Sequence, residues 1–292
     1  MKIATLVLAV AFLAMPLAAS AEKAKTIDEL AKMYDSSSCK ACHAEIYAQW
    51  EKSHHARPLM GVKDGLMMTP LAKKGATAFS PDDPKKATVK NYPCFKCHLP
   101  QALTSAEDSV AVEYTEALLA GDKAKVAKLQ ITCITCHSDK AILHKRELGE
   151  PKKGVLYSTK AVASHPDGTY KSVEKSAIMK DSVYCGQCHG LGPNFDSDQV
   201  FQCANLYGSY LHNYVSGGGT ESCQDCHMKK GDHLIAPNWN DQKGSEELLA
   251  KAISLDVHTL GYEWLKKAGT LVPKIVVGTK ITTTAGHRIP DG

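Results

Sequence analysis

The sequence lacks both a membrane-spanning apolar run and a block of like charge. Its one marked apolar stretch, residues 3–17, is shorter than the ~20 residues that a transmembrane helix needs. The 35 Lys and Arg are scattered among 31 Asp and Glu, for a formal net charge of +4. A scattered distribution of this kind does not form the basic patch that nucleic-acid binding requires. The sequence therefore predicts neither a transmembrane helix nor a nucleic-acid partner.

The first 21 residues have the three parts of a secretory signal peptide. Lys2 supplies the positive charge, residues 3–17 the apolar core, and Ala19-Ser20-Ala21 the cleavage site. No cysteine follows that site, so a lipid anchor there is not indicated. We expect residues 1–21 to be removed and the mature protein to be exported, either periplasmic or extracellular and associated with the outer membrane.

Ten of the eleven cysteines fall in five copies of Cys-x-x-Cys-His. This pentapeptide is the attachment signal for c-type haem, in which both thiols bond the porphyrin and the histidine ligates the iron. The pattern therefore predicts five covalently attached haem c groups. The fifteen predicted attachment residues are Cys39, Cys42 and His43; Cys94, Cys97 and His98; Cys133, Cys136 and His137; Cys185, Cys188 and His189; and Cys223, Cys226 and His227.

Other interpretations of Cys-x-x-Cys do not account for this pattern. A zinc ribbon uses two cysteine pairs for each metal, and five pairs is an odd number. A thioredoxin-like redox motif is expected once, near a βαβ unit. Disulfide bonds would not explain a histidine at the same offset in all five copies. Haem attachment is the interpretation that explains every copy.

The predicted fold is mainly α, with extensive irregular loops organised around the five haems and a short β segment at the C-terminus. We assign residues 22–270 to the pentahaem domain and residues 271–292 to a β-like terminal segment. The intervals between the first cysteines of successive motifs alternate between long and short, which predicts close pairing of motif two with three and of four with five.

Local sequence patterns predict the helices and the strand. Helices are expected after the capping residue Thr26 and over 44–50, 105–119, 198–215, 245–253 and 262–267. Gly121 is expected to end the helix over 105–119, Asp122 to cap the next helix, and residues 275–283 to form a strand.

The predicted terminal strand needs a partner, because a single strand is not stable in water. It is followed by Pro290-Asp291-Gly292, a turn signal that is usually followed by another strand. The strand could pair with an upstream segment, with another subunit, or with residues beyond the given sequence. We expect self-association or a missing C-terminal partner segment.

The second axial ligand of each iron separates an electron carrier from a catalyst. Thirteen histidines less five in the motifs leave eight, more than the five distal positions require. This surplus favours bis-histidine ligation throughout and argues against an open site, so no catalytic residue is predicted. The distal candidates are His55, His144, His212, His233 and His287, with His54, His165 and His258 in reserve and Met60, Met67, Met68 and Met228 as further sulfur donors.

Three segments resemble a known superfamily. Cys39-Lys-Ala-Cys-His43 followed by Ile46, Trp50 and Ser53-x-His55-Ala56 resembles the opening motif of tetrahaem-cytochrome-c-like proteins. That superfamily includes the electron acceptor from hydroxylamine oxidation and many multihaem cytochromes of metal-reducing bacteria. Residues 223–233 resemble a second motif of these proteins, and residues 285–292 resemble their Gly-His-x-x-Pro-Thr-Gly segment. The resemblance implies His55 and His287 as distal ligands, although relatives generally continue beyond the last motif.

The expected function is an exported electron-transfer relay in respiratory, extracellular electron transfer. Its partners would be redox proteins such as other cytochromes or an outer-membrane conduit. A reductase of a nitrogen or sulfur oxyanion is one alternative; however, pentahaem nitrite reductases carry Cys-x-x-Cys-Lys, and all five motifs here end in His. A subunit of a conductive cytochrome filament is another alternative.

The eleventh cysteine, Cys203, is expected to be a small buried residue, with a functional thiol or an intermolecular disulfide as the alternative.

Overall fold

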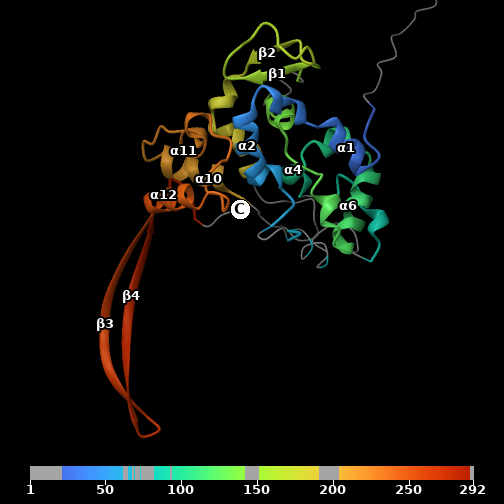
Figure 1. Ribbon diagram of the computed structural model, residues 1–292. Coiled ribbons are helices and arrows are strands. Elements are labelled where there is room, and N and C mark those ends of the chain that lie inside the picture. Colours follow the sequence, from blue (N-terminus) through green and yellow to red (C-terminus); the bar gives the residue numbers. More distant parts are fainter. Residues whose placement is uncertain are drawn as a thin grey trace, which may run out of the picture.

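A computed structural model gives the arrangement of the chain (Figure 1). It describes residues 22–61, 65–67, 69, 73, 82–92, 94–141, 151–190 and 204–289. The predicted signal peptide, residues 1–21, lies outside the described residues, as do His144, Met68, Cys203 and the turn at 290–292.

The N-terminal part is helical and begins where its capping residue predicts. Thr26 caps α1 (Ile27–Met33) by accepting a hydrogen bond from the Glu29 backbone N–H. A 3₁₀ helix, η1 (Ser37–Ala41), carries the first motif into α2 (Ala44–Lys52), and η2 (His54–Ala56) follows directly. The predicted helix over 44–50 is therefore confirmed, and it is continued by the turn that holds His54 and His55.

The helical hairpin predicted between the second and third motifs is confirmed. After η4 (Pro84–Lys86), the chain forms α4 (Phe95–His98), α5 (Ala102–Ser105), α6 (Asp108–Ala120) and α7 (Lys123–Val126). Gly121 ends α6 with a φ of 74°, a conformation that favours glycine. The Asp122 carboxylate then caps α7 by accepting from the Lys125 backbone N–H.

The main hydrophobic core lies within this N-terminal part. Its buried residues run in sequence from Ala24 to Leu129. Tyr92, Phe95 and Tyr114 form its aromatic centre, with ring centroids 4.7 to 5.2 Å apart. Because Phe95 is also the residue after the first cysteine of the second motif, packing of this ring holds that motif against the core.

The middle of the chain contains two short strands. A π-helical turn, η5 (Thr135–Asp139), holds the third motif, and β1 (Val155–Ser158) pairs in parallel with β2 (Ser172–Lys175). A turn at Pro166-Asp167-Gly168 lies between these strands, where Gly168 has a φ of 70°. The 3₁₀ helix η6 (Ala177–Lys180) then leads to α9 (Ser182–His189), which carries the fourth motif.

The C-terminal helices form a second group, beside the N-terminal helices in Figure 1. The long helix expected over 198–215 is described from residue 204 and is helical from residue 206, as α10 (Leu206–Tyr210) continuing into the π-helical turn η7 (Leu211–Val215). The fifth motif forms α11 (Cys223–His227), followed by η8 (Lys229–Gly231). The predicted helix over 245–253 is α12 (Gln242–Ala252).

A long antiparallel hairpin extends away from both helical groups (Figure 1). It consists of β3 (Ile253–Lys267) and β4 (Thr270–Thr283). The expected strand over 275–283 is confirmed as part of β4, and its partner is the upstream segment. Residues 262–267 were expected to be helical, and this prediction was wrong. A six-residue helix is marginal without a cap, whereas Tyr262 and Trp264 favour strands and pair with Ile275 and Pro273.

The described fold is thus mixed, with helices in two groups and two separate two-stranded sheets. The prediction of a mainly helical chain with irregular loops holds for the helical groups. The prediction of only a short β segment was wrong, because the terminal hairpin has strands of 15 and 14 residues. Within the described residues, every helix is too short or too polar to span a bilayer.

Candidate haem-attachment sites

Four of the five motifs lie on helical turns, and the first lies where η1 meets α2. The second is on α4, the third on η5, the fourth on α9 and the fifth on α11. In a helical turn the residues at i, i+3 and i+4 share one face. Both thiols and the imidazole of such a motif are therefore presented to the same side, as one porphyrin requires.

Local hydrogen bonds form the helical turn of the fifth motif. The Ser222 hydroxyl accepts from the Asp225 backbone N–H, and the Asp225 carboxylate accepts in return from the Ser222 N–H, which is a capping box. Asp181 caps α9, the helix of the fourth motif, by accepting from the Val183 backbone N–H. Short-range capping thus determines where these motif helices begin.

Three motif histidines are oriented by backbone carbonyl groups. His98 Nδ1 donates to the Pro58 carbonyl at 2.6 Å, and His137 Nδ1 donates to the Tyr157 carbonyl at 2.8 Å. His227 Nδ1 donates to the Ala236 carbonyl in the same way. Because the proton is held on Nδ1, the unprotonated Nε2 is available to a metal, an arrangement typical of metal-binding histidines.

Burial keeps the clustered imidazoles in the neutral form that ligates iron. Desolvation lowers the pKa of His55 to about 4. Desolvation also lowers the pKa of His98, His137, His189 and His227 below the ordinary value for histidine. At neutral pH these side chains are therefore uncharged, and their ring nitrogens are ready to bind a metal without loss of a proton.

Three motif histidines each face a second imidazole. The ring centroids are 6.2 Å apart for His189 and His55, 6.3 Å for His137 and His233, and 6.1 Å for His227 and His287. With a metal–nitrogen bond of ~2 Å and a centroid ~1 Å beyond the nitrogen, two axial imidazoles on one iron lie ~6 Å apart. The spacing therefore fits the two axial ligands of one haem iron at motifs four, three and five.

Hydrogen bonds also hold the imidazoles that face these motifs. His233 Nδ1 donates to the Gly231 carbonyl at 2.7 Å, and His287 Nδ1 donates to the Arg288 carbonyl at 2.9 Å. The His233 backbone N–H donates to Gln49 Oε1 on α2 at 3.0 Å, which links this loop to the N-terminal helices. The His55 carbonyl accepts from the Ile131 N–H at 3.0 Å. Hydrogen bonds thus hold the rings of His233 and His287 and the backbone of His55, on different elements that converge on the motifs.

The other spare histidines lie in different surroundings. His212 is exposed on η7, and His258 is exposed on β3. The His54 ring contacts Trp239 edge-on, with centroids 4.1 Å apart. Among the described side chains, neither His43 nor His98 faces a second imidazole at axial spacing. His144 lies outside the described residues.

His165, ranked only in reserve from the sequence, lies near the first motif. It is half-buried, its Nδ1 donates to Asp167 Oδ1 at 2.6 Å, and both side chains act electrostatically on the Cys39 thiol. The loop between β1 and β2 thus brings this histidine to a motif more than a hundred residues earlier. A turn signal at residues 166–168 was visible in the sequence, but the segment that this loop packs against was not.

Thiol contacts connect the motifs to one another. The Cys39 and Cys133 thiols interact with each other, as do the Cys185 and Cys223 thiols. Cys97 Sγ donates to the Cys188 carbonyl at 3.3 Å. Motif one therefore contacts motif three, motif four contacts motif five, and motif two contacts motif four. The spacing of the cysteines predicted the contact of four with five, but it predicted motif three as the neighbour of motif two.

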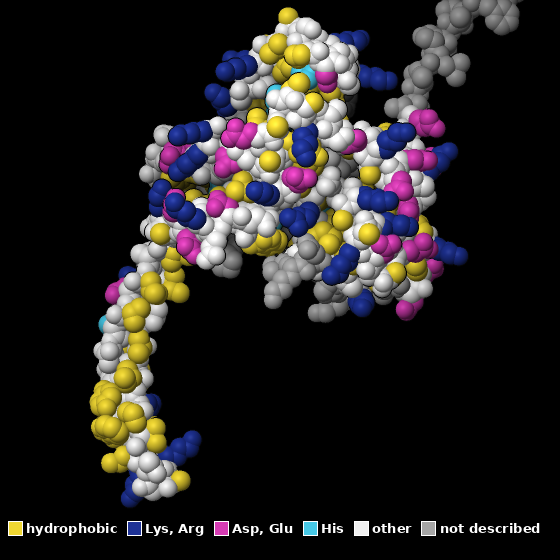
Figure 2. Space-filling model, viewed as in Figure 1, with side chains coloured by type: hydrophobic (Ala, Val, Ile, Leu, Met, Phe, Trp, Pro, Cys, Tyr) yellow, Lys and Arg dark blue, Asp and Glu magenta, His cyan; other side chains and the backbone are white. Residues whose placement is uncertain are grey.

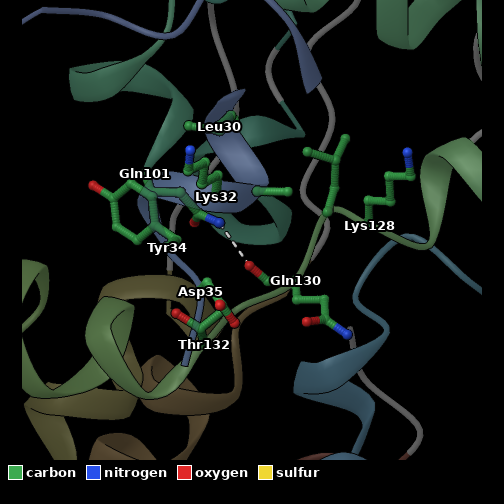
Figure 3. A pocket seen from close by; sticks show the side chains of 10 residues that line it. Leu30, Lys32, Tyr34, Asp35, Gln101, Lys128, Gln130 and Thr132 are labelled. Atoms are coloured by element: carbon green, nitrogen blue, oxygen red, sulfur yellow. Dashed lines mark hydrogen bonds between the residues drawn. The ribbon is translucent and has the colours of Figure 1, made fainter. Parts of the chain in front are cut away.

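A cavity beside the third motif is separate from the motif residues. A cavity of about 350 Å³ lies between α1 and the segment that leads into the third motif (Figure 3). Gln101 Nε2 donates to the Gln130 carbonyl across one side at 2.6 Å, and the Tyr34 hydroxyl donates to Asp139 at 2.6 Å. These bonds connect α1 and α5 to the third motif. None of the lining residues belongs to a Cys-x-x-Cys-His copy, so the cavity adds no attachment residue.

Comparison with known families agrees with this geometry. Residues 38–138 match the family described as cytochrome c554 and c-prime. The matched segment contains the first three motifs and supports a c-type cytochrome, with covalently bound haem c and a role in electron transfer. No curated protein and no solved structure matches the chain.

Proposed function

We propose that this c-type cytochrome carries five haems and works as an electron-transfer relay outside the cytoplasm, in respiratory electron transfer directed to extracellular acceptors. The family match extends over three of the five motifs. The other two copies, at 185–189 and 223–227, have the same residues at the same offsets and lie on helical turns. The same chemistry is therefore available at all five.

The facing imidazole pairs are the observation that carries this proposal. Haem iron supplies reversible one-electron transfer when it is bound, and its axial ligands set the potential. At motifs three, four and five, a second histidine faces the motif histidine and would fill the iron position at which a substrate could bind. Filling both axial positions favours transfer of electrons over chemistry on a small molecule. This favours a carrier over a reductase.

The thiol contacts support an order for the relay. Each thiol lies next to the rim of the porphyrin that it bonds, so thiols in contact bring two rims close together. The contacts Cys39–Cys133 and Cys185–Cys223 join one with three and four with five. The Tyr184 hydroxyl donates to the Cys136 carbonyl at 2.7 Å and joins motif three to α9, the helix of motif four. We infer a chain one–three–four–five, with motif two joined to four.

The proposed location and partners follow from the signal peptide and from the two ends of this chain of motifs. Motifs one and five are the two ends of the inferred relay, so the haem at one of them would receive electrons and the haem at the other would release them. The partners would be other cytochromes or an outer-membrane conduit. Their recognition depends on the surfaces around His43 and His227, which lie in the first and fifth motifs.

Haem counting and spin state test the proposal on the exported protein. The pyridine haemochrome assay should give five haems per chain, and a Cys223→Ala/Cys226→Ala variant should give four. Electron paramagnetic resonance of the oxidised protein should be dominated by low-spin signals. Fewer than five haems in the native protein would contradict the pentahaem assignment. A high-spin haem that binds and reduces nitrite would contradict the carrier role and favour a reductase.

A further inference from the structure

The two faces of the β3–β4 hairpin differ in chemistry. Residues directly opposite each other in an antiparallel pair point to the same face. One face, here called the apolar face, is formed by the pairs Leu255–Ile281, Val257–Thr279, Thr259–Val277, Tyr262–Ile275, Trp264–Pro273 and Lys266–Leu271. The opposite, polar face is formed by the pairs Ser254–Thr282, Asp256–Lys280, His258–Gly278, Gly261–Val276, Glu263–Lys274, Leu265–Val272 and Lys267–Thr270.

A β-bulge keeps the apolar residues on one face along the whole hairpin. The register shifts between Thr259 and Gly261, which leaves Leu260 as the extra residue of β3. Before the bulge the apolar face takes odd-numbered residues of β3, such as Val257. After it the same face takes even-numbered residues, such as Tyr262 and Trp264. Without the extra residue, the two aromatic rings would point to the opposite face.

The apolar face has no cover within the described residues. Eight of its large side chains are each more than half exposed: Leu255, Val257, Tyr262, Trp264, Leu271, Ile275, Val277 and Ile281. Figure 2 shows hydrophobic side chains gathered along one side of the projecting hairpin. A two-stranded hairpin alone is at best marginally stable in water. A packing partner would stabilise it by removing these side chains from solvent.

The size of the face matches a small protein–protein interface. At ~3.4 Å per residue the hairpin is ~48 Å long, and two strands with their side chains are ~10 Å wide. The apolar face therefore measures on the order of 500 Å², as large as the largest apolar patch of a typical monomer. Two such faces packed together bury on the order of 1,000 Å², the lower limit of a specific interface.

We propose that the apolar face docks on the same face of a second copy of this chain. Two hairpins packed face to face would form a four-stranded sandwich, the usual way in which two amphipathic sheets bury their apolar sides. A second copy supplies a face of identical length and chemistry, as a two-fold symmetric interface requires. Lys266, the charged residue of this face, lies near the turn and can stay solvated there.

The charge distribution supports this orientation. Four of the five charges on the polar face are paired within one hairpin, since Lys274 Nζ lies 2.7 Å from Glu263 Oε1 and Asp256 is directly opposite Lys280; the fifth, Lys267, lies beside the turn. The polar face is therefore suited to water. Desolvation of the apolar face costs little, because its side chains are almost all uncharged. The chemistry of the two faces thus selects which one is buried in a dimer.

Two neighbouring residues of β4 provide a matched test on the haem-loaded protein. Ile275 is on the apolar face and Val276 is on the polar face, and both side chains are exposed. Molar mass is measured by sedimentation for the native protein, for Ile275→Lys and for Val276→Lys. We expect a native dimer, at least tenfold weaker association for Ile275→Lys, and unchanged association for Val276→Lys. The haem absorbance spectrum should be the same in all three, because neither residue belongs to a motif.

Three results would overturn the proposal. The first is a native protein that stays monomeric at ~100 µM, a concentration that populates dimers of even modest affinity. The second is an equal effect of both substitutions. The third is a monomer that sediments with vesicles of anionic phospholipid and loses this property in Ile275→Lys, which would assign the face to a membrane surface instead.

Discussion

At the scale of single residues, the candidate sites depend on how each imidazole is held. A histidine outside the motifs can be an axial ligand or an ordinary surface residue, and the sequence alone does not distinguish the two. The structure separates them by two properties, a hydrogen bond from Nδ1 to a fixed acceptor and a facing imidazole about 6 Å away. His233 and His287 have both properties. His258 has neither among the described residues, although it was a reserve candidate.

Removal of one facing imidazole should open one iron. In His287→Ala we expect about one haem per protein to change from low spin to high spin, because the distal ligand opposite His227 is lost. Electron paramagnetic resonance of the oxidised protein measures the change. His258→Ala is the matched control, since this side chain is exposed on β3. Unchanged spin states in His287→Ala would show that His287 is not an axial ligand.

Trp50 should contribute to stability through one buried hydrogen bond. Its Nε1 donates to the Ile131 carbonyl at 2.9 Å and joins α2 to the segment that leads into the third motif. Trp50→Phe leaves that buried carbonyl without its donor, so we expect a loss of about 1–3 kcal/mol in the free energy of unfolding.

Thermal or denaturant unfolding of the haem-loaded protein measures the effect of Trp50→Phe. Trp239→Phe makes the same chemical change at a side chain that is 52% exposed, and it should stay within about 0.5 kcal/mol of the native protein. An equal loss of unfolding free energy in both variants would mean that the hydrogen bond from Trp50 to the Ile131 carbonyl does not stabilise the protein.

At the scale of elements, local chemistry predicted helices better than strands. Thr26, Gly121 and Asp122 act where their side chains or backbone conformation suggested, because capping depends on residues only a few positions apart. The strand conformation of residues 262–267 depends instead on pairing with β4 across the hairpin turn, with partners three to thirteen residues away. Such pairing is not visible in a local pattern, and the helical prediction there was wrong.

A substitution at Gly121 tests whether local backbone conformation determines the end of α6. Its φ of 74° is strained for a residue with a Cβ, while no heavy atom lies within 4 Å of the position that a Cβ would occupy. Gly121→Ala should therefore destabilise the protein by about 1 kcal/mol through the backbone alone. Gly121→Asn should cost less, because asparagine tolerates this conformation better. A melting temperature for Gly121→Ala at or above the native value would contradict the argument.

At the scale of the whole molecule, the polypeptide core is concentrated at one end. The main core cluster lies between Ala24 and Leu129. In the described segment 204–289, only Ser209, Asn238 and Ala252 are buried. A group of helices with so little buried protein surface needs another source of apolar contact. Covalent porphyrins at motifs four and five would supply it, together with cross-links between chain and cofactor.

Loss of haem should therefore affect the two ends unequally. In apoprotein produced without haem attachment, we expect amide hydrogen-exchange protection to survive mainly in α1 and α6 and to be lost from α10 to α12. The unfolding transition should also be broad and non-cooperative, since much of the core is missing. Hydrogen exchange with mass spectrometry measures both regions in one sample. Full protection of α12 in the apoprotein would show that the C-terminal helices fold without cofactor.

Sequence alone predicts the cofactor chemistry of this protein. Five copies of one pentapeptide predict the cofactor type, the attachment atoms and one axial ligand each, because all of these are contained within five consecutive residues. Helix caps were predictable for the same reason. Which spare histidine faces which motif was decided only by tertiary structure, since His55 meets His189 and His233 meets His137 across about a hundred residues or more. The same is true of the order of the motifs and of the apolar face of the hairpin, because each depends on contacts between segments that no local pattern encodes.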